Sequence, residues 1–255
     1  MAIATEAVRR YSPDEAAAVV QRLRQIAEEG FEKQVFPHRY MQELMAGTLP
    51  LSKIRGFFLN WYRFALEINT VKSEAYNHFL PFLERHPDCY DIFTTQIADE
   101  LIHPGPGGHV KMLHRTGAAL GISVEEMVEA MLIPEGRALV DVRVRLWREG
   151  PPAEAWASSM TEGPIGVWLG MWYDALTKHY GLSDEDAIYF SKHYEADTQE
   201  HEEGIMAHGL GNGYVLQKLL EDGYRPARPS WNVEYSTQLS VDLYELFLNG
   251  VYARY

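Results

Sequence analysis

Residues 52–80 read "SKIRGFFLNWYRFALEINTVKSEAYNHFL", and their apolar side chains recur at intervals of three and four positions. This interval matches the 3.6-residue turn of an α-helix, so the segment predicts one long helix with a buried aromatic face. Sustained alternation of apolar and polar residues, which is typical of half-buried strands, occurs nowhere in the chain. The sequence therefore favours an all-α fold.

Capping signals predict where further helices begin. Ser12 and Ser123 each precede a glutamate by three positions, which is the pattern of an N-terminal capping box. Capping and periodicity together predict about eight helices: residues 13–30, 52–80, 88–103, 134–149, 152–180 (interrupted at 163–164) and 233–251, with two more beginning at 123 and 183. No linker or internal repeat divides the chain. We therefore expect a single all-α domain over residues 1–255, a bundle of about seven to eight helices.

The composition argues against several classes of protein. Acidic residues outnumber basic residues by 36 to 23, and the net charge of −13 would repel a nucleic acid. Cys89 is the only cysteine, which excludes an internal disulfide framework and favours a reducing, cytoplasmic compartment. No window holds 18 uninterrupted apolar residues, so we expect no membrane span. The first residues contain no apolar segment of the kind found in secretory signal peptides.

The segment 189–204, "YFSKHYEADTQEHEEG", places His193, Asp197 and His201 at intervals of four. On a helix these side chains share one face but spread over about 12 Å along the axis. One metal ion cannot easily bind both end residues, whereas two ions about 3.5–4 Å apart could, or a local π-bulge could shorten the spacing. The alternative interpretation is an exposed polar face with scattered histidines.

Two other segments carry candidate ligands. "ADELIHPG" (98–105) places Glu100 and His103 three residues apart, a spacing found in non-haem di-iron carboxylate proteins, although both could simply lie on a fraying helix end. The loop "PGPGGHV" that follows is expected to let water or O2 approach. Glu162, in "SSMTEGPIGVW" (158–168), lies in an apolar segment beside a proline. Unless it turns outward, burying this carboxylate costs several kcal/mol without a neutralising cation, and a metal ion would supply one.

Together the three segments supply three carboxylates and three imidazoles as candidate metal ligands: Glu100, His103, Glu162, His193, Asp197 and His201. Nitrogen and oxygen ligands without thiolate suit iron or manganese. A ferritin-like bundle would need two Glu-x-x-His motifs. The chain has only one, at Glu100 and His103, so that architecture is not expected.

The ordered motifs, Glu-x-x-His, then Glu-Gly in a kinked helix, then His-x3-Asp with a following His, resemble the haem-oxygenase-like di-iron oxidases and oxygenases. Those proteins share the seven- or eight-helix fold of TenA proteins and pyrroloquinoline quinone synthase. The resemblance covers residues 31–247, although many members have His-x3-Asp-x2-His where this chain has His-x3-Asp-x3-His. It implies that the six residues bind two Fe(II) ions per chain, one of them weakly, and that O2 is a co-substrate. It also implies oxidation of a small molecule, an amino acid, amine or fatty acid, by C–C cleavage, decarboxylation or N-oxygenation.

Rival functions can be compared on the same residues. TenA-type thiaminases use a cysteine nucleophile, whereas Cys89 lies outside the ligand-bearing segments. Pyrroloquinoline quinone synthase is metal-free and has a basic pocket, whereas a carboxylate-rich pocket is expected here. A non-catalytic binding protein would bind no metal and consume no O2. We expect a homodimer supplied with electrons by an external donor. Four aromatic residues are predicted either to bind substrate or to pack the core: Trp61, Phe64, Trp168 and Trp172.

Overall fold

The aromatic segment forms the longest helix, α3 (Leu51–Leu83), in the computed structural model, which describes residues 7–103, 105, 107–199 and 206–255. Ile54, Phe57, Phe58 and Trp61 are buried along it. The helix predicted over residues 52–80 is therefore confirmed. Its apolar face packs against the rest of the bundle, which explains why it forms.

The chain forms more helices than the seven or eight expected. The described residues contain no β-strand, only two isolated bridges. The other helices are α1 (Pro13–Gly30), the π-helix η1 (Phe31–Val35), α2 (Arg39–Met45), α4 (Pro87–Leu101), α5 (Gly108–Ala119), α6 (Val124–Glu129), α7 (Pro134–Glu149), α8 (Pro152–Ser158), the 3-10 helix η2 (Ser159–Thr161), α9 (Glu162–His179), α10 (Ile188–Thr198), α11 (His208–Asp222) and α12 (Val233–Arg254).

One extra helix arises because the predicted segment 152–180 is broken slightly earlier than expected. The break is the 3-10 turn Ser159–Thr161, and α9 begins at Glu162 with Pro164 in its first turn. A proline lacks an N–H and clashes with the carbonyl four residues before it, so it is best tolerated in the first turn of a helix. The disruption therefore falls before Pro164 rather than at residues 163–164.

The helix α11 was not predicted at all. Its first six residues include Gly209, Gly211 and Gly213, which lower helix propensity. Tertiary packing explains why the helix forms nevertheless. A Cβ on Gly211 would lie 2.8 Å from Ile92 of α4, and one on Gly209 would lie 2.9 Å from the Cα of Gly163. The glycines thus let α11 approach its neighbours closely, which outweighs their low propensity.

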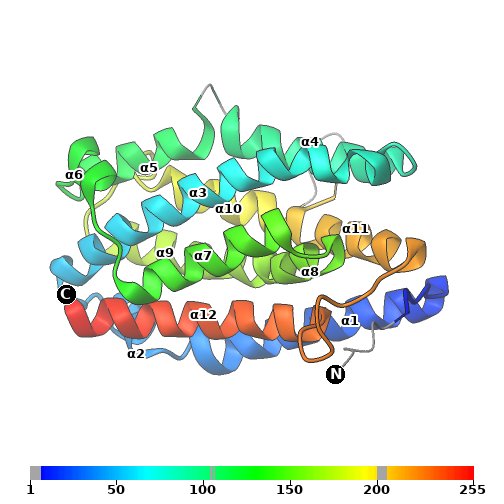
Figure 1. Ribbon diagram of the computed structural model, residues 1–255. Helices are drawn as coiled ribbons and strands as arrows, with labels where there is room; N and C mark the ends of the chain where they lie inside the picture. The colour runs from blue at the N-terminus through cyan, green and yellow to red at the C-terminus, as the bar shows by residue number, and fades with distance from the viewer. Residues whose placement is uncertain (1–6, 104, 106, 200–205) are drawn as a thin grey trace.

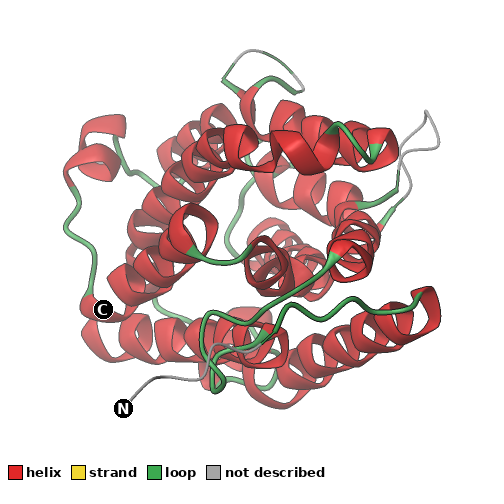
Figure 2. Cartoon of the chain, turned by 45° about the vertical axis from the view of Figure 1, so that its right-hand side comes forward, coloured by secondary structure: helices red, strands yellow, loops and turns green. Residues whose placement is uncertain are grey.

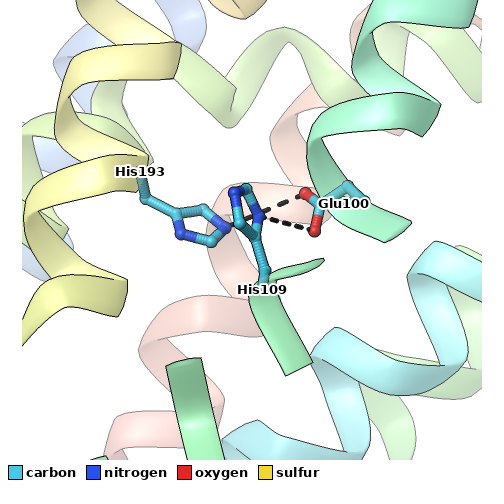
Figure 3. Close-up of side chains that lie close together, drawn as sticks. All are labelled: Glu100, His109 and His193. Carbon is cyan, nitrogen blue, oxygen red and sulfur yellow. Dashed lines mark hydrogen bonds and ion pairs between the residues drawn. The ribbon is translucent and has the colours of Figure 1, made fainter. Parts of the chain in front are cut away.

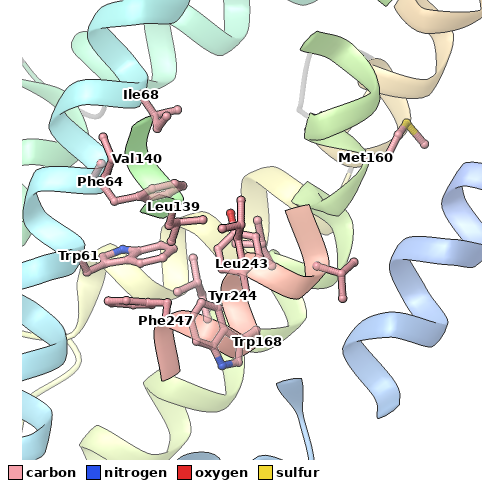
Figure 4. Close-up of a cluster of buried hydrophobic side chains, with 14 of the residues drawn as sticks. Trp61, Phe64, Ile68, Leu139, Val140, Met160, Trp168, Leu243, Tyr244 and Phe247 are labelled. Carbon is pink, nitrogen blue, oxygen red and sulfur yellow. The ribbon is translucent and has the colours of Figure 1, made fainter. Parts of the chain in front are cut away.

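The helices lie side by side in layers, with α12, α1 and α2 along one side of the bundle and α3, α4 and α5 along the other (Figure 1). Figure 2 shows the bundle turned, with α-helices on all sides of the interior. Aromatic side chains fill part of that interior: Trp61 of α3, Trp168 of α9 and Tyr244 and Phe247 of α12 lie together (Figure 4). Within the described part of the chain, no helix is long and apolar enough to cross a bilayer.

Helix α10 lies directly against α9 because two glycines face it. A Cβ on Gly166 would come within 2.6 Å of the Cβ of Asp197, and one on Gly170 would come within 3.0 Å of the Tyr194 ring. Ordinary side chains at these two positions would force the helices apart. The close contact brings Asp197 to the start of α9, where Glu162 lies.

Candidate metal centre

Six ionisable side chains from five helices meet inside the bundle in two groups of three. In each group one ligand atom per residue lies within 4.8 Å of the others. The first triad joins Glu100 of α4, His109 of α5 and His193 of α10, and the second joins Glu162 of α9, Asp197 of α10 and His208 of α11. Both triads thus take one residue from α10, and the two residues are one helical turn apart.

The first triad is held by short polar contacts (Figure 3). His109 Nδ1 lies 2.9 Å from Glu100 Oε2, and His193 Nε2 lies 3.8 Å from Glu100 Oε1. His193 Nδ1 lies 2.9 Å from the carbonyl oxygen of Tyr189, which can only accept a hydrogen bond. When His193 is neutral, its proton therefore lies on Nδ1 and Nε2 carries the lone pair, as in many metal-binding histidines.

Charges in the first triad favour an ionised carboxylate. Burial would raise the pKa of Glu100, but the imidazoles of His109 and His193 outweigh burial and hold this pKa well below its usual range. Burial also lowers the pKa of His109, so its imidazole favours the neutral form, whereas contact with Glu100 outweighs burial and raises the pKa of His193. A carboxylate and a neutral imidazole are the protonation states in which these side chains bind metals.

In the second triad, other protein groups already occupy the carboxylates. Glu162 accepts hydrogen bonds of 2.7 Å from Lys72 Nζ and of 2.7 Å from Asn212 Nδ2. His208 lies between two acids, with Nδ1 at 3.2 Å from Asp197 and Nε2 at 2.9 Å from Asp99. The group is therefore electrostatically satisfied by its own neighbours.

The pKa shifts of the second triad follow from these contacts. Burial would lower the pKa of His208, but its hydrogen bonds to Asp197 and Asp99 outweigh burial and raise this pKa to about 10. Burial would likewise raise the pKa of Glu162, but the charge of Lys72 holds it below its usual value. His208 is therefore a cation at neutral pH and must release a proton before its imidazole can bind a metal ion.

An internal cavity of about 50 Å³ connects the two triads. Five of the six triad residues line it, and Trp61, Phe64, Lys72, Arg143 and Tyr244 form much of the rest of its wall. The space admits a few water-sized groups beside the ligands. Its wall thus combines the ionisable side chains of the triads with an apolar, partly aromatic side.

Four of the six ligands expected from the sequence lie in the triads: Glu100, Glu162, His193 and Asp197. His103 does not join them, because α4 ends at Leu101 and His103 is exposed beyond the helix end. The i,i+3 spacing places two side chains on one face only while the helix continues. His201 lies outside the described residues.

Two triad histidines, His109 and His208, were missed in the sequence. His109 lies in the segment expected to be a loop, yet it is the second residue of α5. Gly108, with φ +48°, lets this helix start against α4, since a Cβ there would lie 2.1 Å from the carbonyl oxygen of Glu100. His208 is the first residue of the unpredicted α11. Both histidines are next to glycines that permit close helix contacts, and this neighbourhood is the signal that could have revealed them.

The four aromatic residues expected at the substrate divide into two pairs. Trp61 and Phe64 line the cavity. Trp168 and Trp172 are not among its lining residues and pack the core instead: Trp168 Nε1 donates to Met41 Sδ at 3.0 Å, and the Trp172 ring lies 4.1 Å from that of Phe57.

The fold and the sequence define the class of protein. The model of the TENA/THI-4/PQQC family matches residues 20–208, and the chain belongs to this family, which includes enzymes. The chain is also 26% identical over 196 residues to a pyrroloquinoline-quinone synthase of Rhizobium meliloti (strain 1021), a match that covers 76% of this chain and 74% of that protein.

Solved structures show the same haem-oxygenase-like fold. A TenA homologue from Pseudomonas syringae pv. tomato DC3000 has a TM-score of 0.70 at 18% identity, covering 98% of this chain and 99% of its own. A domain with a heme oxygenase-like fold from Shewanella denitrificans OS217 has a TM-score of 0.65 at 12% identity, covering 93% of this chain and 92% of its own. A CADD-like protein from Nostoc punctiforme also has a TM-score of 0.65, at 13% identity, covering 92% of this chain and 97% of its own.

Proposed function

We propose that the protein is an O2-dependent oxidoreductase that binds two iron(II) ions in the two triads and oxidises a small molecule. The observation that carries the proposal is the pair of buried carboxylate–imidazole triads on one cavity. Three carboxylates and three imidazoles without a thiolate match the ligand preference of iron or manganese. The chemical class of the side chains that converge therefore fits the metal pair.

The chain's own residues have separable roles in this proposal. Glu100, His109 and His193 would hold one ion, and Glu162, Asp197 and His208 the other. When bound, iron supplies the electrons that reduce O2. The Tyr189 carbonyl keeps the His193 proton away from the ligand nitrogen.

The cavity wall complements the ligands. Trp61 and Phe64 exclude bulk water on the aromatic side of the cavity. Lys72 carries a counter-charge for Glu162 until a second ion replaces it. Because that ion must displace Lys72 or Asn212 and a proton of His208, we propose that the second site is the weaker one.

A second candidate is a metal-free oxidase similar to pyrroloquinoline-quinone synthase. Two observations favour it: the relative of that name, and the hydrogen bonds that satisfy Glu162 and His208 without any added cation. A TenA-type hydrolase with a cysteine nucleophile has less support. Cys89 is buried, does not line the cavity, and burial raises the pKa of its thiol to about 12.

Anaerobic titration with Fe(II), followed by exposure to O2, separates the candidates. The proposal expects two irons per chain, bound with unequal affinity, and O2 uptake that depends on them. Glu100→Gln should remove the tight iron, and Asp197→Asn the weak one. O2 uptake by metal-free protein with substrate would support the second candidate instead. The expected homodimer and external electron donor stay predictions, for which sedimentation and reductant screening are the measurements.

A further inference from the structure

Three residues of the cavity wall carry a buried hydrogen-bond donor without an acceptor among the described residues. They are Arg143 Nε, Asn69 Nδ2 and the Tyr244 hydroxyl, none of which donates a hydrogen bond to another described residue, although Thr161 lies within hydrogen-bonding reach of the Tyr244 oxygen. Their residues are 1%, 5% and 0% exposed, so bulk solvent does not reach them. A buried donor without an acceptor costs about 1–3 kcal/mol, and three around one space indicate that something else accepts from them.

Arg143 is the most informative of the three. It lies on α7, and its Nη1 donates to the Ser158 carbonyl at 2.5 Å and to Thr161 Oγ1 at 3.3 Å, which fixes the plane of the guanidinium. No carboxylate among the described residues forms an ion pair with it. A fully buried guanidinium normally has an anionic partner, because its desolvation is otherwise costly.

The charges around the cavity would also attract an anion if two metal ions were bound. Glu100, Glu162 and Asp197 carry three formal negative charges, and Lys72 and Arg143 carry two positive ones. With neutral imidazoles the lining is therefore close to balanced. Two divalent ions would leave it three charges positive, and a buried excess of that size attracts an anionic ligand.

We propose that Arg143, Asn69 and Tyr244 form a carboxylate-binding subsite, so that the substrate is a short carboxylic acid whose carboxylate lies on these three donors. The inference rests on the proposed function and names its substrate class. A carboxylate has two oxygens that accept bonds from all three donors, whereas an amine offers only donors and is repelled by Arg143. The 50 Å³ space and the adjoining Trp61, Phe64 and Ile68 (Figure 4) suit a short apolar chain rather than a long fatty acid.

The experiment compares propionate with propylamine and 1-propanol by isothermal titration calorimetry, on metal-free and on anaerobically Fe(II)-loaded protein. We expect propionate to bind at least tenfold more tightly than propylamine, with 1-propanol in between. Tyr244→Phe removes a hydroxyl that donates no hydrogen bond to another described residue, so the fold should persist while propionate binds roughly three- to tenfold more weakly. Asn69→Ala should have a similar effect, and Arg143→Gln should weaken binding at least tenfold.

Tyr40→Phe is the matched control. Tyr40 is equally buried, but its hydroxyl donates to the Lys53 carbonyl outside the cavity, so propionate affinity should not change. Equal binding of propionate and propylamine would overturn the subsite, and so would unchanged propionate affinity in Tyr244→Phe and Asn69→Ala. If Arg143→Gln does not fold, these two variants alone test the subsite. If the protein does not bind iron, the proposed function is refuted, but the subsite still predicts that metal-free protein prefers propionate to propylamine. Iron binding without that selectivity refutes the subsite alone.

Discussion

Lys72 and Glu162, 90 residues apart in the sequence, form an ion pair of 2.7 Å inside the bundle, with only 6% and 11% of their side chains exposed. The pair joins the middle of α3 to the first residue of α9. It also places an ammonium group on a carboxylate that the proposed function assigns to the second metal ion. We therefore expect Lys72 to stabilise the metal-free protein and to compete with the second ion of the proposed function for the same carboxylate.

Replacing Lys72 with methionine should separate these two effects. The substitution leaves Glu162 buried without its cation, so the free energy of unfolding of metal-free protein should fall by about 3–5 kcal/mol. Affinity for the second metal equivalent should rise, by at least tenfold, because its competitor is gone. Urea unfolding with and without Mn(II) measures both. Lys192→Met, which breaks an exposed pair with Glu195, should cost less than about 1 kcal/mol and leave metal affinity alone. Unchanged affinity in Lys72→Met would contradict the competition.

His109 and His103 offer the sharpest contrast between a triad ligand and a nearby histidine. His109→Ala removes one of three ligands of the first triad, so Fe(II) affinity there should fall at least tenfold. His103→Ala alters an exposed side chain beyond α4 and should leave Fe(II) affinity within twofold of wild type. Iron content after desalting, measured by atomic emission, tests both variants. The reverse ranking would restore the Glu-x-x-His prediction and remove His109 from the centre.

The pKa of His208, raised to about 10 by Asp197 and Asp99, predicts two pH dependences. The histidine titrates near 6.5 in the unfolded chain, so the folded state holds a proton that the unfolded state loses. Its stabilisation of metal-free protein should be complete below pH 6.5 and disappear progressively as the pH rises toward 10. Chemical unfolding of wild type and His208→Asn across that range checks this. A constant difference between them would contradict it.

Metal binding should show the opposite trend. The second ion must displace the proton of His208, so its apparent affinity should rise by up to tenfold per pH unit between pH 6 and 8. Titration with Mn(II), followed by electron paramagnetic resonance, reports this slope.

Gly166→Ala should damage the site without replacing any candidate ligand. The new Cβ would lie 2.6 Å from that of Asp197, and so force α10 away from α9. We expect a loss of about 1–3 kcal/mol of stability and weaker binding of the second ion. Gly163→Ala is the control on the same helix, because its Cβ would meet nothing within 4 Å. Thermal denaturation and metal titration should leave that variant close to wild type, and equal damage in both would point to the backbone rather than to the contact.

Cys89 should be chemically inert in the folded protein. Burial and the neighbouring Asp88 raise the pKa of its thiol to about 12, so almost no thiolate is present at pH 8. We expect alkylation by iodoacetamide at pH 8 to be at least a hundredfold slower in native than in urea-unfolded protein. Cys89→Ala should retain catalytic activity. Loss of activity in that variant would favour a cysteine-dependent hydrolase.

Local signals in the sequence were sufficient for much of the fold. The capping boxes at Ser12 and Ser123 form as expected, because each involves only residues three positions apart. The apolar period of α3 likewise records which face is buried. Glu162 could be singled out because an acid in an apolar segment needs a partner, although Lys72 proved to be the one that the structure shows.

The remaining ligands depend on contacts between distant segments. His109 and His208 enter the triads only because α5 and α11 begin against α4 and α9, where Gly108 and Gly209 permit close approach. Such approach depends on two surfaces at once, and neither segment alone reveals its partner. The spacing of Glu100 and His103 instead favoured His103 as a ligand, but α4 ends at Leu101, two residues before this histidine.

One rigid rod, α10, carries His193 and Asp197 a single turn apart, and each belongs to a different triad. A small rotation or translation of α10 about its axis would move both side chains together. The two triads are therefore coupled through α10, because a displacement of this helix alters the geometry of both at once.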